Sequence, residues 1–360
     1  MKAIIFAGGV GTRLWPISRK NAPKQFEKIV GDKSTLQLAA DRLYPSFKPA
    51  DIYISTGESY KDVVHAQMPQ IPRENFIFEP EIRDVGPAVA TACAIVGKMS
   101  PNEPVAIIWS DHFVKKERRF REVLGFAEKL VEENSNLIIL IGQRARFANQ
   151  NVGWIEFGRE VKTIRDTKLF EFKRLIYRPA LSDAQKFIES DTFAWNPGYF
   201  VTTAKFILNA YKKHAHSIWE GVVKIQEAFG TENFDNVMKR EYPKLEKVSF
   251  DNAILEKLDP AHVLVIAADL GWSDVGAWEA LKEALQVSSK ENVNRGKVLL
   301  TDSTDNLVFN YTDQLAVTID LKGTIVINTD DVLLICDKNS VPKIKKLVES
   351  LSGTEHEKLT

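Results

Sequence analysis

A glycine-rich segment that contains two kinds of cation follows a short apolar run near the start of the chain, in the sequence FAGGVGTRLWPISRKNAPKQF. Consecutive glycines let a backbone approach a ligand closely and turn its N–H groups toward an anion. Arg13 adds a forked guanidinium suited to phosphate oxygens, and Lys24 adds a mobile ammonium group. The segment therefore predicts a phosphate site, with Gly8, Gly9 and Gly11 as backbone donors.

Two familiar phosphate-binding motifs do not fit this segment. The motif GxGxxG fails because Leu14 stands where the last glycine is required. The motif GxxxxGK[ST], counted from Gly8, fails because Arg13 stands at its second glycine position. The phosphate site must therefore be of another kind, and the competing interpretation is a tight strand-to-helix turn with solvated basic residues.

The first third of the chain alternates strand-like and helix-like segments. Such a rhythm predicts a doubly wound α/β sheet, and ligands of these sheets bind outside the carboxyl ends of the strands. Both the glycine-rich segment and Asp111 follow such strand ends. We expect strands at 3–7, 51–56, 75–80, 105–111 and 136–142, and helices at 34–44 (with Ser34 as N-cap), around 63–64, at 86–99 and at 117–133.

The second half of the chain changes character twice. Residues 152–274 mix short strands with helices around 181–190 and 203–228. Residues 292–337 hold short β-rich runs separated by turns at nearly even spacing, which predicts a small β-helix-like unit, and a last helix is expected at 341–351. We place the domain boundary in the polar stretch after residue 288, which gives a large α/β domain at 1–288 and a small β-helix-like domain at 289–360.

The composition excludes several classes of protein. The 360 residues are 44% hydrophobic and carry a formal net charge of zero, which argues against general attraction to nucleic acid. The only cysteines, Cys93 and Cys336, lack neighbours at metal-ligand spacing and are interpreted as reduced core residues of a cytoplasmic protein. No stretch has the length and apolarity of a signal peptide or a membrane span.

A long signature points to a family that this chain resembles. The pattern GGxGTRLWPxSRxxxPKQF, which begins at Gly8, resembles that of the sugar nucleotidyltransferases that make GDP-mannose, the mannose-1-phosphate guanylyltransferases. A lone glycine motif is weak, but a signature of this length is specific. The resemblance continues in EPEIRDVGPAVA (79–90), SDH (110–112), VGWIEFG (152–158), WNPGYF (195–200), SFDNAILEK (249–257), GWSDVGAWEAL (271–281) and the β-rich tail.

The resemblance implies that GTP and mannose 1-phosphate give GDP-mannose and diphosphate. The sugar phosphate attacks the α-phosphorus in line, so catalysis is mainly positioning and charge neutralisation. Arg13 would neutralise the departing β,γ-phosphates and Lys24 the α-phosphate, which makes them the catalytic cations. Asp111 and Asp274 would hold Mg²⁺, which prefers one or two carboxylates with phosphates and water. Each aspartate also has a structural interpretation, as a helix cap or a turn residue.

The remaining predicted binding residues lie in the segments that resemble those of the family. Nucleotide binding falls to Gly8, Gly9, Gly11, Thr12, Arg13, Lys24, Arg83, Asp84, Pro87 and Ser110. Sugar-phosphate binding falls to Gly153, Tyr177, Arg178, Asn196, Asp251 and Glu256.

Departures from the family pattern concern the base and the sugar. Trp109 and Ser110 replace the family's Pro-Ala, and Asp84 and Gly86 alter its RNTAPA segment. A carboxylate accepts hydrogen bonds from the adjacent N–H donors of guanine, which adenine lacks, so we hypothesise that Asp84 keeps the guanine preference. The loop at 145–150 has no clear counterpart of the family's PTRPET segment.

On the sugar side, the segment LIYRP (175–179) aligns best with the family's FxEKP. Arg178 could replace the lysine, with Lys173 and Arg174 as alternative phosphate ligands, but Tyr177 is not equivalent to a carboxylate as an acceptor for two hydroxyls. Pro197 also removes a backbone donor beside the retained Asn196. Mannose is therefore the leading sugar, and another hexose or a heptose 1-phosphate is the alternative.

The competing function is a catalytically weak, regulatory relative that binds a nucleotide sugar. Loss of Arg13, Lys24, Asp111 or Asp274 would have favoured it, and all four are present. We expect one activity, because the β-rich segment reaches close to residue 360. The partners expected are GTP and the sugar phosphate, with no nucleic acid and no membrane, and the β-rich tail could mediate a homodimer.

Overall fold

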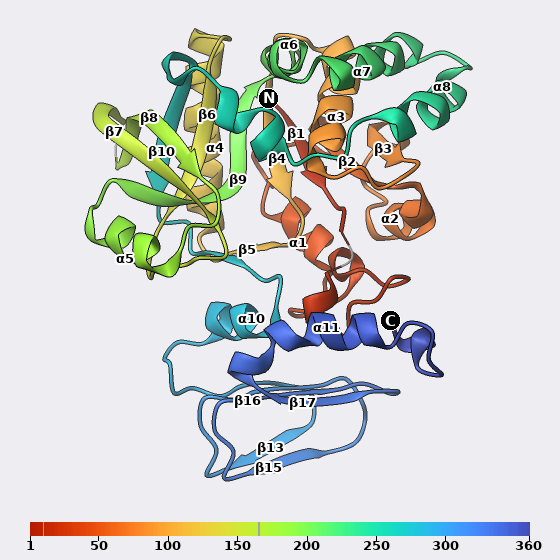
Figure 1. The fold of residues 1–360 in the computed structure, drawn as a ribbon, viewed down its shortest axis with the longest axis vertical. Coiled ribbons are helices and arrows are strands. Elements are labelled where there is room, and N and C mark those ends of the chain that lie inside the picture. The colour runs from red at the N-terminus through yellow and green to blue at the C-terminus, as the bar shows by residue number, and fades with distance from the viewer. Residues whose placement is uncertain (10, 165) are drawn as a thin grey trace. The chain divides into compact units, whose positions relative to one another are not determined.

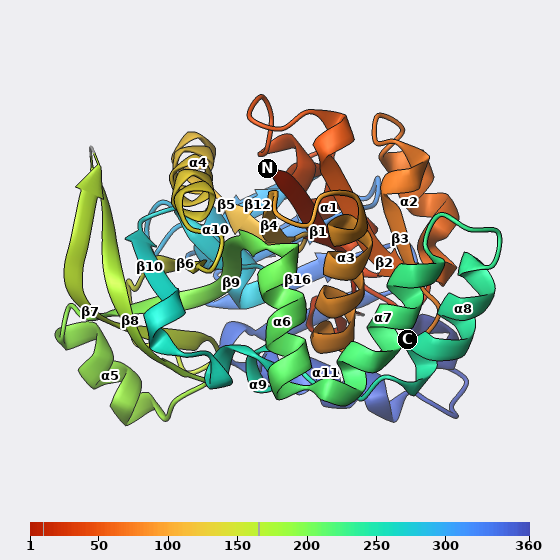
Figure 2. The ribbon, with the colours of Figure 1, turned by 90° about the horizontal axis from the view of Figure 1, so that it is seen from above.

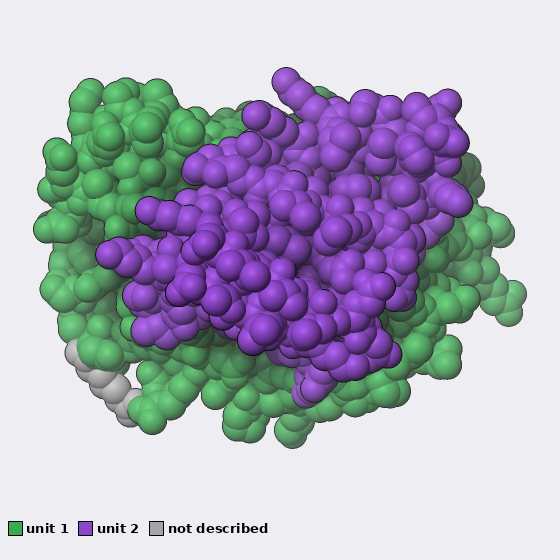
Figure 3. Space-filling view, turned by 90° about the horizontal axis from the view of Figure 1, so that it is seen from below, with its two compact units in different colours: residues 1–8, 39–110, 114–271 green, residues 9–38, 111–113, 272–360 purple. Residues whose placement is uncertain are grey.

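The computed structural model describes residues 1–9, 11–164 and 166–360, and its chain forms two compact units, each of which collects segments that are far apart in the sequence (Figures 1 and 3). The first unit comprises Met1–Gly8, Ala39–Ser110 and Val114–Gly271. The second unit comprises Gly9–Leu38, Asp111–Phe113 and Trp272–Thr360. Among the described residues, no helix combines the length and the apolarity needed to cross a membrane.

The first unit is built on a nine-stranded sheet with the order β3-β2-β1-β4-β9-β6-β10-β8-β7. Its first four strands run parallel, with β1 paired to both β2 and β4, and the antiparallel strand β9 joins them to β6. The strands of this sheet are β1 (Lys2–Phe6), β2 (Ile52–Gly57), β3 (Phe76–Glu79), β4 (Pro104–Trp109), β6 (Ile138–Arg144), β7 (Gly153–Ile164), β8 (Thr167–Ile176), β9 (Phe193–Thr203) and β10 (Val263–Ala268).

Helices cover both faces of this sheet: Figure 2 shows α4 on one face and α3, α6 and α7 on the other. Strand β1 is a continuous apolar run because its central residues are buried on both faces. The predicted α/β class is therefore confirmed. The helices of this unit are α2 (Lys61–Gln67), α3 (Val85–Met99), α4 (Glu117–Glu133), α5 (Leu181–Glu189), α6 (Ala204–His214), α7 (His216–Ala228), α8 (Phe234–Glu241) and α9 (Phe250–Ala253).

Helix α1 (Thr35–Asp41) begins in the second unit and ends in the first. The predicted cap is confirmed as a reciprocal pair, since the Gln37 N–H donates to Ser34 Oγ and the Ser34 N–H donates to Gln37 Oε1. The expectation of short strands in 152–274 holds for β10, which has 6 residues, but not for β7, β8 and β9, which have 12, 10 and 11. The far half of β7 is exposed on both faces, so its sequence lacks the alternation that marks a strand.

The second unit contains a β-helix-like stack of short strands. Strands β12, β14 and β16 pair in parallel, β17 adds to β16 in the antiparallel direction, and β13 pairs with β15. This confirms the β-helix-like C-terminal segment. The elements are β12 (Val293–Arg295), β13 (Val298–Thr301), β14 (Leu307–Asn310), β15 (Ala316–Ile319), β16 (Thr324–Asn328), β17 (Leu333–Asp337), α10 (Trp278–Leu285) and α11 (Pro342–Ser350).

The glycine-rich N-terminal segment shares its hydrophobic core with this β-rich stack. Leu14, Trp15 and Ile29 pack in one cluster with residues of α10, β14, β16 and α11. The Trp278 indole N–H donates to the Trp15 carbonyl at 2.8 Å, and the Trp15 indole N–H donates to the Leu359 carbonyl at 2.7 Å. The core of the second unit therefore fixes the start of the predicted phosphate segment.

The cysteines differ from each other in burial. Cys93 lies in the core of the first unit, and burial raises the pKa of its thiol to about 12. Cys336 is only partly buried against the core of the second unit, so its interpretation as a core residue is wrong. Cys336 lies on β17, whose alternate side chains are exposed.

Candidate functional site

The two charged residues predicted for phosphate and metal form an ion pair in the second unit. Lys24 begins a short 3-10 helix (Lys24–Phe26), and Asp111 precedes the short strand β5 (His112–Val114). Lys24 Nζ lies 2.6 Å from Asp111 Oδ2, and the two side chains are 9% and 27% exposed. Burial alone would raise the pKa of Asp111, but the charges of Lys24 and His112 outweigh it and hold that pKa well below its usual value.

Gly11 makes room for the lysine of this pair. Gly11 has φ of +67°, and a Cβ on it would lie 2.6 Å from Lys24 Cδ and 2.7 Å from Lys24 Cγ. The backbone N–H of Lys24 donates to Ser18 Oγ at 3.1 Å. The glycine and the serine of the signature therefore position the lysine, a purpose for which the spacing of the sequence gave no signal.

Two more of the predicted site residues, Arg13 and Asp274, lie beside Gly276. Asp274 ends strand β11 (Trp272–Asp274), which pairs with β5. A Cβ on Gly276 would lie 2.8 Å from Asp274 Oδ1 and 3.1 Å from Arg13 Nη2, so both side chains reach the space that this glycine leaves open. The sequence predicted both charges but not the glycine that accommodates them.

Glu279 is an acidic neighbour that was not predicted from the sequence. It stands in the first turn of α10, and its Oε2 is buried with no hydrogen-bond partner among the described residues. Burial raises the pKa of Glu279, the charge of Arg13 lowers it and the charge of Asp274 raises it again. Its position, only five residues after Asp274 at the start of a helix, was the available signal.

The acids of this unit fit a divalent ion only in part. Within the described part of the chain, no three or more His, Cys, Asp or Glu residues gather closely enough to hold a metal by themselves. Asp111 and Asp274 flank two paired strands and offer hard carboxylate oxygens. Such a set suits Mg²⁺, which usually takes one or two carboxylates and completes its shell with phosphates and water.

Two of the three further residues of the predicted nucleotide site, Gly8 and Gly9, border open space. Gly8 and Gly9 have no atom within 4 Å of an added Cβ, and Gly9 has φ of +93°. Thr12 begins a 3-10 turn (Thr12–Leu14) and is half-buried. Gly8 and Gly9 therefore leave room for a ligand to approach the backbone.

In the first unit, the predicted base-recognition segment is held tightly at the start of α3. Asp84 has φ of +68°, and its carboxylate accepts from the Val85 N–H at 2.7 Å. The Gly86 N–H donates to the Val248 carbonyl at 2.9 Å, and a Cβ on Gly86 would lie only 2.5 Å from that oxygen. The departure from the family pattern at Gly86 thus has a structural reason, because the Val248 backbone leaves no room for a side chain.

The other three predicted nucleotide-binding residues of the first unit differ in their surroundings. Arg83 donates to Glu81 at 3.1 Å, and its buried Nε has no partner among the described residues. Pro87 is buried within α3. Ser110 is 1% exposed, and its N–H donates to the Phe6 carbonyl at 3.1 Å.

Several residues predicted for the sugar or the base come together in the first unit. The Asn196 side chain donates to Asp251 Oδ1 at 3.4 Å, and Gly153 pairs with Asn196 between strands β7 and β9. Burial raises the pKa of Asp251, and the charges of Glu256 and Asp84 raise it further. Asp84 therefore lies close enough to Asp251 for their charges to interact, and Glu256 accepts from Asn252 at 3.1 Å.

Tyr177 and Arg178 are not part of this group. Both are exposed, and the Arg178 guanidinium lies 5.2 Å from the Tyr177 ring centre. Among the described residues, no hydrogen bond or ion pair joins either one to Asp251 or Asn196. The alternative phosphate ligands Lys173 and Arg174 both pair with Glu156.

Two further features of the first unit were not anticipated. Glu79, at the end of β3, accepts from the Tyr242 hydroxyl at 2.6 Å and from Ser55 Oγ at 3.0 Å. A Cβ on Gly198 would lie 2.5 Å from the Trp109 indole nitrogen, so the tryptophan that departs from the family pattern packs against this glycine. Each contact joins segments distant in the sequence, which local patterns do not reveal.

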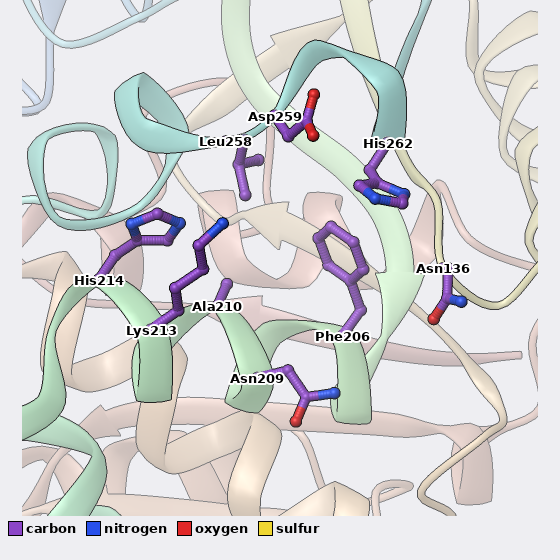
Figure 4. Close-up of a pocket in the computed structure, with 9 residues that line it drawn as sticks. All are labelled: Asn136, Phe206, Asn209, Ala210, Lys213, His214, Leu258, Asp259 and His262. Atoms are coloured by element: carbon purple, nitrogen blue, oxygen red, sulfur yellow. The ribbon is translucent and has the colours of Figure 1, made fainter.

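A separate cavity of about 310 Å³ lies in the first unit at α6 (Figure 4). Phe206 and Ala210 line it, together with Lys213 and His214 from the end of that helix and His262 from the segment before β10. None of the predicted site residues is among the described residues that line it. The cavity therefore does not belong to the candidate site.

The candidate residues divide between the two units. Arg13, Lys24, Asp111 and Asp274 belong to the second unit. The group around Asp251 belongs to the first unit. The chain passes from one unit to the other at residues 8–9, 38–39, 110–111, 113–114 and 271–272.

Comparison with known proteins gives a consistent result. Residues 2–291 match a family model described as nucleotidyl transferase, and residues 296–351 match one described as a MannoseP isomerase/GMP-like beta-helix domain. A mannose-1-phosphate guanylyltransferase of Escherichia coli K12 is 31% identical over 97% of this chain and 73% of that protein. A second one, of Salmonella muenchen, is 28% identical over 99% of this chain and 75% of that protein.

A solved structure shares the fold along almost the whole chain. A crystal structure described as mannose-1-phosphate geranyltransferase from Thermus thermophilus has a TM-score of 0.86 and 24% identity. The match covers 98% of this chain and 99% of the other. At this level of identity the likeness concerns the fold.

Proposed function

The chain belongs to the nucleotidyl transferase family, and we propose that it transfers a guanylyl group from GTP to α-D-mannose 1-phosphate, giving GDP-mannose and diphosphate. Its similarity to mannose-1-phosphate guanylyltransferases over nearly its full length supports the proposal. The observation that carries it is the gathering of Lys24, Asp111, Arg13 and Asp274, from three distant segments of the chain, in one compact unit.

Catalysis of the proposed reaction depends mainly on positioning the substrates and neutralising phosphate charge. A phosphate oxygen of the sugar attacks the α-phosphorus of GTP while diphosphate leaves, so one P–O bond forms as another breaks. We assign Lys24 to the α-phosphate, where negative charge accumulates, and Arg13 to the departing β,γ-phosphates. Gly8, Gly9, Gly11 and Thr12 would supply backbone donors along the same phosphates.

Asp111 and Asp274 are the residues that would hold Mg²⁺. When bound, this ion neutralises phosphate charge and orients the oxygens that leave. The contribution of the chain is a pair of carboxylates at the ends of two paired strands, near the cations that we assign to the phosphates.

Substrate selection falls to residues of the first unit. Asp251 and Asn196 present an acceptor and a donor for sugar hydroxyls, with Gly153 and Glu256 nearby. Arg178 remains the proposed ligand of the sugar phosphate, next to Tyr177. Asp84 is the proposed guanine contact, and Arg83, Pro87 and Ser110 complete the nucleotide set.

Diphosphate release by the purified protein tests the proposal directly. We would cross GTP, ATP, UTP and dTTP with a panel of hexose and heptose 1-phosphates in the presence of Mg²⁺. We expect release with GTP and mannose 1-phosphate, and a loss of at least about a hundredfold in kcat for Asp111→Asn and for Lys24→Met. Lys28→Met is the matched control, because Lys28 is exposed on the same segment.

The other outcomes distinguish the alternatives. Release with a different sugar 1-phosphate would keep the proposed reaction but change the proposed substrate. This alternative is the first to examine, because the exposed Tyr177 stands where the family has a carboxylate. Absence of release with every pair, in a folded protein that still binds a nucleotide sugar, would contradict the enzymatic proposal and favour a regulatory role.

A further inference from the structure

Lys24 and Asp111 are assigned to different partners in the reaction, yet in the structure each is the other's partner. The ammonium nitrogen and the carboxylate oxygen are 2.6 Å apart, and 9% of the lysine side chain is exposed. We propose that Lys24 occupies Asp111 until a nucleotide arrives, so that the protein takes up its divalent ion together with the nucleotide and not before it.

The geometry supports this order for an electrostatic reason. A magnesium ion bound to Asp111 would lie about 2.1 Å from a carboxylate oxygen, and therefore within a few ångströms of the ammonium group of Lys24. Two cations at that separation repel each other. The ion pair therefore lowers the affinity of Asp111 for a metal in the nucleotide-free protein.

Contacts with Ser18 and Gly11 position the backbone and the middle of the Lys24 side chain. The Lys24 backbone N–H is held by Ser18, and the Cγ and Cδ atoms pass directly over Gly11. The terminal ammonium group can leave Asp111 only for another anion within its short reach. The phosphates of a nucleotide supply such an anion, and they bring further oxygen ligands for the metal.

Metal binding without turnover tests the proposal. We would measure Mn²⁺, as a substitute for Mg²⁺, by equilibrium dialysis of the full chain without sugar phosphate, in the presence and absence of GTP. We expect the wild-type protein to retain little Mn²⁺ alone and to retain it when GTP is present. The Lys24→Met variant should bind Mn²⁺ without nucleotide at least about tenfold more tightly than the wild type.

Three variants test whether the ion pair itself causes the weak binding. Lys28→Met removes the same charge from an exposed position of the same segment and should behave as the wild type. Lys24→Arg keeps the cation and should keep nucleotide-free Mn²⁺ binding weak. The double variant Lys24→Met/Asp111→Asn should bind nucleotide-free Mn²⁺ no more tightly than the wild type. This result would show that Asp111 holds the additional ion.

Equal Mn²⁺ affinity of the wild type and Lys24→Met without nucleotide would overturn the proposal. Equal retention by the wild type with and without GTP would overturn it too, and this arm needs no variant to fold. The proposal rests on the proposed function for the identity of the nucleotide. The two nevertheless fail separately, because the comparison without nucleotide is independent of catalysis, and diphosphate release decides the reaction.

Discussion

The side chain of Lys24 passes over Gly11 so closely that a Cβ on the glycine would lie 2.6 Å from Lys24 Cδ. Position 11 therefore favours glycine for two reasons. Its φ is +67°, and a side chain there would collide with a buried lysine. The glycine of the signature shapes the path of a cation as well as offering a backbone donor.

Gly11→Ala tests this relationship through activity. The added methyl group should displace Lys24 from Asp111 and reduce kcat by at least about tenfold. Separately, the left-handed backbone should lower the stability of the variant by ~1–2 kcal/mol. Gly31→Ala is the matched control, because Gly31 has the same φ of +67° and no atom within 4 Å of an added Cβ. Equal losses of kcat in the two variants would show that backbone strain alone explains the effect.

Gly86→Ala should destabilise the protein although it lies in a helix. Alanine normally stabilises a helix interior by ~1 kcal/mol, but here its methyl group would lie 2.5 Å from the Val248 carbonyl oxygen. We expect the free energy of unfolding to fall by about 1–3 kcal/mol, measured by urea denaturation. Gly125→Ala, in α4 with nothing within 4 Å, should instead be neutral or stabilising, and the same sign for both variants would contradict this account.

Asp84→Ala tests the proposed guanine contact. Loss of a hydrogen-bonding carboxylate should reduce the ratio of kcat/KM for GTP over ATP by about tenfold or more. The variant also loses the cap on Val85, so stability should fall by ~1 kcal/mol independently of the base preference. If the GTP to ATP ratio is unchanged while stability falls, Asp84 is only a helix cap.

Glu79→Gln should change the pH dependence of stability. Burial raises the pKa of Glu79, although hydrogen bonds from Tyr242 and Ser55 lower it in part. A raised folded-state pKa favours the folded protein below about pH 4.3, the unfolded value, and this contribution is lost as pH rises through the folded-state pKa. Relative to the wild type, the Gln variant should therefore be less stable at pH 4 than at pH 7, measured by urea denaturation.

Tyr242→Phe provides the control for this prediction. It removes the 2.6 Å hydrogen bond but leaves the carboxyl group, so the pKa of Glu79 should rise further. The free energy of unfolding should then fall by a larger amount between pH 4 and pH 7. A pH-independent difference between the wild type and Glu79→Gln would mean that Glu79 has the same pKa in the folded and unfolded states.

Much of the fold was predictable because its signals are local. The apolar run of β1, the helix α4 and the reciprocal cap at Ser34 follow from residues within one or two turns of each other. The exposed far half of β7 was not predictable as a long strand, because a strand with two solvated faces carries no alternation. The roles of the site residues remain predictions.

By itself the sequence determined which chemical groups are available: a glycine-rich segment with Arg13 and Lys24, and acids at strand ends. Only the tertiary structure decided that Lys24 meets Asp111, and that Asp84 lies near Asp251. The physical reason is that these contacts depend on the order of strands in a sheet and on a core shared by residues 9–38 and 272–360. Such long-range packing is set by the burial of apolar surface from the whole chain, which no local pattern contains.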